Sequence, residues 1–193
     1  MPLSPQAQSV FTANDAINSG DPNREADGSV KELVYGVRMT EELNNFMPEA
    51  SELLQIAARA QHIERWILPR SDYPMDRAGY KKWRTELGMH HAKRASELMQ
   101  ANGYSDQDCQ TVADMLQKKR LKRDPDVQAL EDVICLVFIR YYLEDFAAKH
   151  DEPKLISIIQ KTWNKMSEAG HEAALKIALP EPMLALITKA LSP

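Results

Sequence analysis

Cysteine, glycine and long apolar runs are all scarce in this sequence, and each scarcity excludes a class of protein. Of the 193 residues two are cysteines, Cys109 and Cys135, too few and too far apart for a disulfide scaffold or a cysteine-based zinc site. We expect both to be small buried hydrophobes in a reducing compartment. Seven glycines leave little room for the tight hairpins of an all-β fold.

No apolar run approaches the roughly 18 residues that a membrane-spanning helix needs. The longest, Val133–Ile139, is far shorter. The N-terminus also lacks the charged and then apolar pattern of a signal peptide. We therefore expect a cytoplasmic protein with no membrane partner.

Short motifs that would announce a reaction are missing as well. The chain has neither a GxGxxG nor a GxxxxGK[ST] loop for nucleotide phosphates. It also lacks the GxSxG elbow of serine hydrolases and the HExxH motif of zinc proteases. Any site must therefore be found from single polar residues in unusual surroundings.

What the sequence does contain is a series of helical patterns separated by short polar or proline-containing breaks. No segment alternates with the period of two that marks a half-buried strand. The expected helices span 8–19, 29–46, 48–68, 79–102, a segment after Ser105, 125–149, 153–168, 170–179 and 181–191. We predict an all-α fold, a single-domain multi-helix bundle over residues 1–193. It would comprise N-terminal helices (1–48), a core (49–168) and C-terminal helices (169–193).

Two of these helices carry more specific expectations. Ser29 and Glu32 have the spacing of a capping box at the start of the second helix. The third helix has apolar residues on two faces, and one face continues through His62 to Trp66. A helix that is apolar all round is buried, so this one is predicted to be central.

Histidines and carboxylates within apolar helices are the first candidates for a site. His62 and His91 share faces with apolar residues, and Glu131 and Asp132 precede the apolar run Val133–Ile139. Two imidazoles and one or two carboxylates suit Mn, Fe, Ni or Zn. The alternatives are histidines that only hydrogen-bond a carbonyl or carboxylate, carboxylates that only favour a helix start, and a pocket without metal.

Basic residues form the second candidate group. Arginine forks match phosphate or carboxylate in a bidentate way. Arg65, Arg70, Arg84 and Lys118 are the candidates for binding an anion, and Asn18, Asn23, Trp66 and Lys161 are further pocket candidates. The alternative is that the arginines pair with carboxylates such as Asp72, Asp76 and Glu131 to fix loops, and that the asparagines are turn and cap residues.

Charge is distributed unevenly along the chain. The total is −4, but residues 49–123 contain 14 basic and 10 acidic groups, whereas both flanking regions are acidic. The middle region is where an anionic ligand is expected. The basic run 118–123 offers contacts for RNA phosphates, yet cations are also favoured at a helix C-terminus. The net charge and acidic flanks argue against a dedicated nucleic-acid protein.

Several blocks in one order carry a resemblance to a known family. They are residues 15–23, 61–66, Pro69-Arg70, Tyr73-Pro74, Tyr80, Trp83-Arg84, His91-Ala92, Gln128, 130–133, 135–138, 161–163 and 165–167. Over residues 10–178 the chain resembles the domain-of-unknown-function family 4202. Members of that family are often labelled glutamyl-tRNA synthetase-like. Class I synthetases have a Rossmann-type sheet and a His-Ile-Gly-His type motif, and this chain has neither.

The order His62, His91, Asp132 is also similar to the HD-type phosphohydrolases. That resemblance implies an all-α enzyme with a metal held near a phosphoester. The chain departs from the pattern where Ala92 follows His91, because the family has Asp there. Three functions follow as expectations: a metal-dependent phosphohydrolase on a phosphorylated or nucleotide substrate, a non-catalytic anion-binding or interaction module, or a tRNA-associated helper without synthetase activity.

Overall fold

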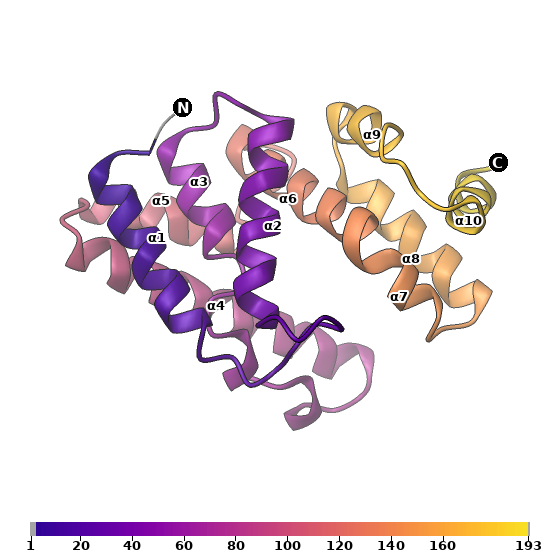
Figure 1. Ribbon diagram of the computed structural model, residues 1–193, viewed down its shortest axis with the longest axis horizontal. Helices are drawn as coiled ribbons and strands as arrows, with labels where there is room; N and C mark the ends of the chain where they lie inside the picture. The colour runs from indigo at the N-terminus through magenta and orange to yellow at the C-terminus, as the bar shows by residue number, and fades with distance from the viewer. Residues whose placement is uncertain (1–2, 193) are drawn as a thin grey trace. The chain divides into compact units, whose positions relative to one another are not determined.

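The protein is all-α, as the sequence predicts. A computed structural model describes residues 3–192, and within that range about 71% of the chain is helical and no strand forms (Figure 1). The nearest approach to a sheet is an isolated bridge between Arg24 and Val30. No helix in the described range combines the length and the hydrophobicity needed to cross a membrane.

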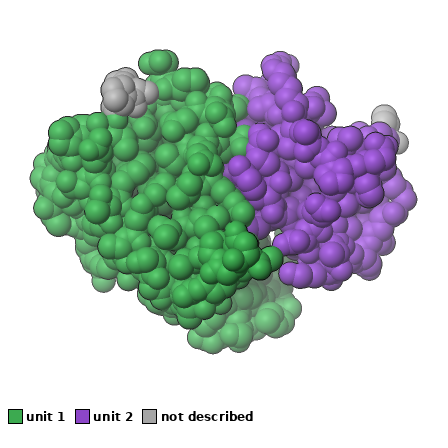
Figure 2. Space-filling model, in the orientation of Figure 1, with its two compact units in different colours: residues 1–120 green, residues 121–193 purple. Residues whose placement is uncertain are grey.

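The chain divides into two compact units, which we call unit 1 (residues 1–120) and unit 2 (residues 121–193) (Figure 2). The boundary lies inside the region 49–168, which the sequence predicts as the core. The predicted parts 1–48, 49–168 and 169–193 stay predictions. Residues 1–2 and 193, which the predicted domain includes, lie outside the described residues.

Unit 1 contains five α-helices and two short 3₁₀ turns among its described residues. They are α1 (Pro5–Asn18), α2 (Lys31–Phe46), α3 (Glu52–Arg59), η1 (Arg65–Ile67), η2 (Arg70–Asp72), α4 (Arg77–Ala101) and α5 (Asp106–Leu116). Helix α3 packs against α1, α2 and α5, and α4 packs along α5. Fully buried apolar side chains from these helices, among them Met39, Leu54, Ile56 and Leu87, form the core.

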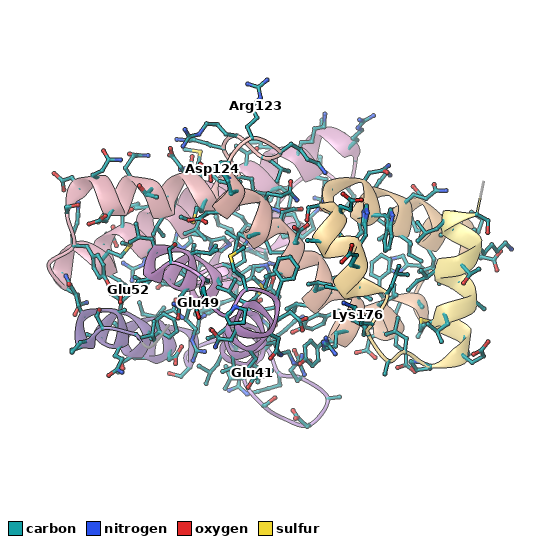
Figure 3. The ribbon with its side chains drawn as sticks, turned by 90° about the horizontal axis from the view of Figure 1, so that it is seen from above. Glu41, Glu49, Glu52, Arg123, Asp124 and Lys176 are labelled. Atoms are coloured by element: carbon teal, nitrogen blue, oxygen red, sulfur yellow. The ribbon has the colours of Figure 1, made fainter. Side chains whose placement is uncertain are left out.

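Serine and aspartate side chains cap most of the helices in unit 1. Ser105 accepts the Asp108 N–H at the start of α5, as expected, and Ser51 does the same for Leu54 in α3. The Glu52 carboxylate, labelled in Figure 3, accepts the Ser4 N–H (2.9 Å) and the Tyr104 hydroxyl (2.5 Å). Burial and this bond raise the pKa of Tyr104 to about 12. Glu52 thereby joins the starts of α1 and α3 to the turn before α5.

The expected capping box of the second helix is wrong. Helix α2 begins at Lys31, after Val30, and the Ser29 side chain bonds Asp27 instead. Asp21 in the preceding loop provides the acceptor at the helix start instead, because its Oδ2 accepts the Glu32 backbone N–H at 3.0 Å. The Glu32 side chain is therefore not needed at the helix start and is buried.

The expected long helix over 48–68 is also wrong, because α3 ends at Arg59. A turn follows, and Glu64 has a φ of 51°, in the left-handed region that side chains disfavour. The Glu64 N–H donates to Asn18 Oδ1 at 3.0 Å. A contact with a residue 46 positions earlier thus holds the break, and His62 lies in the turn rather than on a helix.

Unit 2 contains α6 (Pro125–Val137), a π-helical turn η3 (Phe138–Tyr142), α7 (Leu143–Ala147), α8 (Glu152–Lys165), α9 (Glu168–Ala174) and α10 (Glu181–Leu191). The expected helix over 125–149 begins at Pro125 as predicted, but the π turn interrupts it. Helix α6 packs against α8 and α9, and α8 packs against α10. Cys109 in unit 1 and Cys135 in unit 2 are both buried thiols, as predicted.

The basic run 118–123 lies beyond the end of α5 at Leu116. Its backbone is irregular, with positive φ at Lys118, Arg120 and Lys122. The run therefore follows the C-terminus of α5 directly, where cations are favoured, but it is not itself helical. Lys119, Arg120, Lys122 and Arg123 are exposed, and the run contains the boundary between the two units.

Candidate functional site

A buried carboxylate and a histidine form the centre of the site in unit 1. Glu32 on α2 is 3% exposed, and its Oε2 lies 3.0 Å from Nδ1 of His62. The Tyr35 ring stacks on the His62 ring with centroids 3.8 Å apart, which fixes the imidazole plane. Sequence reasoning missed Glu32 because its position in the chain suggested a helix cap. Only its partner 30 residues away reveals its role.

His91 on α4 lies beside His62. Their ring centroids are 6.0 Å apart. Nδ1 of His91 donates to the Ile63 carbonyl oxygen at 2.7 Å, and the residue is 4% exposed. Both rings thus use Nδ1 for a bond within the protein. Nε2 is the nitrogen that each ring has left for a ligand.

Burial keeps both histidines neutral at pH 7. Burial is the main cause that holds the pKa of His62 and that of His91 well below 6.5. Part of the His62 side chain remains exposed (16%), so the lowering of the pKa by burial is clearer for His91. Burial raises the pKa of Glu32 as well, although the charges of Arg65 and Lys31 oppose the rise.

Several cationic side chains contribute to the lowered pKa of His62. After burial, the groups that lower its pKa are Arg65, Arg84, Lys118 and Lys31, in that order. The ion pair that Arg65 makes with Glu32 is loose, with NH1 and Oε1 3.7 Å apart. Three of the four predicted anion-binding residues, Arg65, Arg84 and Lys118, therefore act on the same histidine.

Three arginine side chains lie close to the ring of Trp83 on α4. The guanidinium carbon of Arg65 lies 5.2 Å from the indole centroid, and those of Arg70 and Arg84 both lie 5.9 Å away. Such distances suit cation–π attraction. The indole Nε1 donates to the Leu68 carbonyl at 2.8 Å, so the ring is fixed in place. Sequence reasoning used Trp83 only for the family resemblance and did not recognise this role.

The three arginines differ in what else they bind. Arg70 donates to the backbone carbonyls of Tyr73 and Asp76 and so fixes the loop before α4, through backbone oxygens and not through the carboxylates named as partners in the sequence analysis. Arg65 has a buried Nε without a hydrogen-bond partner among the described residues. Within the same range Arg84 has no carboxylate partner. Arg65 and Arg84 therefore have hydrogen-bonding capacity left for an anion.

The predicted asparagines lie at the edge of this cluster. Asn18 is 1% exposed, and its side chain donates to the Glu32 carbonyl and accepts the Glu64 N–H. Asn23 bonds Asp21 Oδ1 through both its backbone and its side chain. These contacts are those of turn and cap residues, the alternative that the sequence allowed.

The remaining candidates belong to other elements of the fold. Trp66 is on η1 and half-buried, and Lys161 is an exposed residue of α8 in unit 2. Glu131 and Asp132 are also in unit 2, on α6. Glu131 is 2% exposed, and Lys165 Nζ lies 3.7 Å from its Oε1.

Asp132 is already surrounded by donors within unit 2. Its carboxylate accepts the Ser167 N–H (2.7 Å), the Ser167 hydroxyl (2.5 Å) and the Gln128 amide (3.1 Å). Across residues 3–192 no group of three or more histidine, cysteine or acidic side chains has an arrangement that could hold a metal. A metal bound by His62, His91, Glu131 and Asp132 together stays a prediction.

Comparison with known proteins adds a family but no activity. No curated protein and no solved structure matches the chain. The sequence profile of one family, described as Domain of unknown function (DUF4202), matches residues 8–187. That match covers nearly the whole chain, so the protein belongs to the DUF4202 family.

Proposed function

We propose that unit 1 binds a small phosphorylated molecule at the surface formed by Arg65, Arg84 and Trp83 beside His62. We call this surface the arginine–tryptophan site. The observation that carries the proposal is the pair of guanidinium groups on one fixed indole, both with hydrogen-bonding capacity left. A phosphate with two negative charges would satisfy both arginines with charge-assisted hydrogen bonds.

The electrostatics of the surroundings favour the same class of ligand. Four cationic side chains influence His62, and the carboxylate paired with it, Glu32, has a raised pKa. An anion bound near these cations replaces water as their partner. The electrostatic attraction between them is strongest where the site is partly desolvated. A neutral His62 adds a nitrogen that can accept a proton from a ligand hydroxyl or from a phosphate monoanion.

The test is a calorimetric titration of the whole protein with matched pairs of ligands. AMP and adenosine form one pair, and glucose 6-phosphate and glucose form the other. The proposal expects saturable binding of a phosphorylated member and at least tenfold weaker binding of its neutral counterpart. Equal affinity within both pairs, or no binding of either phosphate at about 50 mM salt, would contradict it.

Metal-dependent phosphoester hydrolysis is the second candidate. The observation in its favour is the pair of neutral imidazoles. The Glu32 carboxylate holds the His62 ring through Nδ1, and the Ile63 carbonyl holds the His91 ring through Nδ1, so Nε2 of each ring is left for a metal. Metal-bound histidines typically have such partners. The donor set is incomplete, however, because no third ligand joins the two rings among the described residues. We therefore derive no catalytic step through a metal.

Elemental analysis of the purified protein tests this second candidate. Near-stoichiometric Mn, Fe, Ni or Zn that disappears in both His62→Ala and His91→Ala would support it. A folded wild-type protein that stays metal-free after soaking would leave the arginine–tryptophan site as a binding site only. A tRNA-associated role stays a prediction from the basic run 118–123, and a gel shift at about 50 mM salt tests it.

A further inference from the structure

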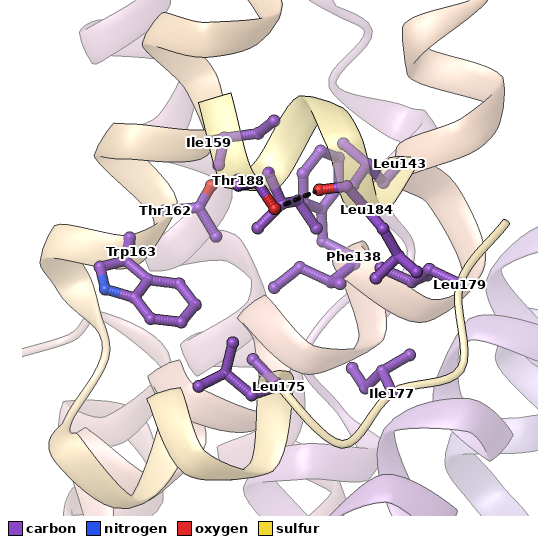
Figure 4. Close-up of a pocket in the computed structure, with 13 residues that line it drawn as sticks. Phe138, Leu143, Ile159, Thr162, Trp163, Leu175, Ile177, Leu179, Leu184 and Thr188 are labelled. Atoms are coloured by element: carbon purple, nitrogen blue, oxygen red, sulfur yellow. Dashed lines mark hydrogen bonds between the residues drawn. The ribbon is translucent and has the colours of Figure 1, made fainter. Parts of the chain in front are cut away.

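Unit 2 contains an apolar cavity that is separate from the arginine–tryptophan site. Its volume is about 90 Å³, and its walls come from η3, α7, α8, α9, α10 and the segment between α9 and α10. Figure 4 shows Phe138, Trp163 and Leu175 around one common space. Protein interiors rarely leave voids larger than one water molecule, so a space of this size requires an explanation.

Water is a poor occupant of this cavity. A buried water needs two to four polar partners, and the wall is almost entirely aliphatic and aromatic. Its hydroxyl groups belong to Thr162 and Thr188, and that of Thr188 already donates to the Leu184 carbonyl at 2.8 Å. The lining includes no charged residue. The chemistry of the wall therefore fits an uncharged apolar group.

Large apolar side chains at the same place remain exposed to solvent. Leu175 is 70% exposed and Leu184 is 41% exposed, and both line the cavity. Exposed apolar side chains around a concave site are typical of a ligand-binding region. One wall is also rigid, because His171 stacks on Trp163 with centroids 4.0 Å apart and bonds its carbonyl at 2.8 Å.

The adjoining π-helical turn η3 is a second unusual feature at the same position. Phe138 and Ile139, its first two residues, both line the cavity. A π turn replaces regular α-helical hydrogen bonds with a wider ring, and such turns occur frequently at functional sites. Here it lies directly against the space.

We propose that this cavity is a binding site for a short uncharged aliphatic chain, which enters past Leu175. At about 90 Å³ the cavity is smaller than the roughly 150 Å³ engineered cavity that takes up benzene, so it fits a chain of about five carbons. The ligand is a small molecule with an apolar tail and a polar end that stays in solvent at the mouth.

The experiment is a titration of the full chain with 1-pentanol, followed by the methyl signals of leucine and isoleucine in NMR spectra. Leu175, Ile177 and Leu184 report directly on the cavity. The proposal expects saturable shifts in these signals. The control compound, 1,5-pentanediol, has the same length but must bury a hydroxyl group, so it should bind at least fivefold more weakly.

Two variants and one matched control decide the location. Ala174→Phe fills the cavity, and Leu175→Asp places a charge at its mouth on an exposed residue, so it should still fold. Ala185→Phe makes the same change as the first variant on a different face of α10, outside the cavity. We expect at least tenfold weaker pentanol binding in both cavity variants and unchanged binding in the control.

The proposal is overturned if the wild-type protein gives no saturable shift, or if Leu175→Asp binds pentanol as the wild type does. If Ala174→Phe fails to fold, Leu175→Asp alone decides. Neither result bears on phosphate binding in unit 1, because the two sites share no residue.

Discussion

At the scale of single residues, the buried polar groups of unit 1 are paired with carbonyls and side chains from distant parts of the chain. His91 is the clearest case, with a neutral ring that is 4% exposed and a bond to the Ile63 carbonyl. Because burial lowers its pKa in the folded state, the unfolded chain takes up a proton at a higher pH than the native protein does. The stability that neutral His91 contributes is present above pH 6.5 and is lost as the pH falls.

This predicts a steeper loss of stability on acidification in the wild type than in His91→Asn. Asparagine keeps a donor for the Ile63 carbonyl but does not titrate. We expect the wild-type free energy of unfolding to fall by up to about 1.4 kcal/mol more per pH unit between pH 6.5 and 5. The raised pKa of Glu32 has the opposite effect on the pH dependence of stability. Glu32 is present in both proteins, so its contribution cancels in the comparison. Urea denaturation at several pH values measures the slopes, and equal slopes would refute the argument.

Asn18 provides a second residue-scale prediction. Its side chain satisfies the Glu64 N–H and the Glu32 carbonyl in a buried position. Asn18→Ala leaves both groups unsatisfied and should lower the free energy of unfolding by about 2–3 kcal/mol. Asn18→Asp keeps the acceptor for the Glu64 N–H, but it buries a charge and turns an oxygen toward the Glu32 carbonyl, so it should also be destabilising. Urea denaturation compares the two, and a loss below about 0.5 kcal/mol in Asn18→Ala would contradict this role.

At the scale of elements, Asp132 joins α6 to the start of α9. Ser167, the N-cap of α9, gives two hydrogen bonds to the Asp132 carboxylate, and Gly170 in α9 approaches the same group. A Cβ atom added at Gly170 would lie 2.6 Å from Asp132 Oδ1, closer than real contacts allow. The apolar neighbours of Asp132 indicate from the sequence that this residue is unusual. They do not indicate that it binds the start of α9, at a residue 35 positions later.

We expect Gly170→Ala to destabilise unit 2 by about 1–3 kcal/mol through overpacking. Asp132→Ala should cost a similar amount or more, because it removes charge-assisted bonds at the start of α9. Ala169→Gly, at the neighbouring exposed position of α9, is the control and should cost only about 1 kcal/mol. The measurement is urea denaturation, and a Gly170→Ala protein as stable as the wild type would show that α9 moves away easily.

Helix starts and apolar stripes explain which elements could be predicted. Ser105 and Pro125 give local signals that operate within a few residues, and the structure confirms the starts of α5 and α6 that they mark. The break after α3 depends on Asn18, and the start of α2 depends on Asp21, both distant in the sequence. Periodicity therefore predicted one helix that continues through His62, and the spacing of Ser29 and Glu32 predicted a capping box.

The candidate site shows the same limit. Residue type alone marked His62, His91 and the arginines, because histidine in an apolar pattern and clustered guanidinium groups are unusual. The sequence could not show that Arg65 and Arg84 share Trp83, since that depends on the turn between α3 and α4. It also gave no sign of the cavity in unit 2, which depends on how α8, α9 and α10 pack.

At the scale of the whole molecule, the division into two compact units predicts where a protease cuts first. The connection near residue 120 contains Lys118, Arg120 and Lys122 with positive φ, and Lys119, Arg120, Lys122 and Arg123 are exposed. Limited trypsin digestion should therefore cleave within residues 118–123 before it cleaves elsewhere. Mass spectrometry of the first fragments tests this. First cleavage within α4 or α6 would contradict the division.

Charge at this scale agrees with the site in unit 1. The chain carries −4 overall, yet residues 49–123, which supply Arg65, Arg84 and Lys118, have an excess of basic groups. A local positive region on an acidic protein attracts small anions without favouring nucleic acid in general.

The binding of phosphate in unit 1 is best tested by measuring the affinity of a phosphorylated ligand for Arg84→Gln and for Arg77→Gln. Both variants remove one arginine charge from α4, but Arg77 is an exposed residue at the start of the helix. Calorimetry on the whole protein with AMP or glucose 6-phosphate, whichever binds more tightly, gives both dissociation constants. We expect roughly 10- to 100-fold weaker binding in Arg84→Gln, which corresponds to the loss of one charge-assisted contact, and nearly wild-type binding in Arg77→Gln. Equal affinities in the two variants would contradict an arginine–tryptophan site in unit 1.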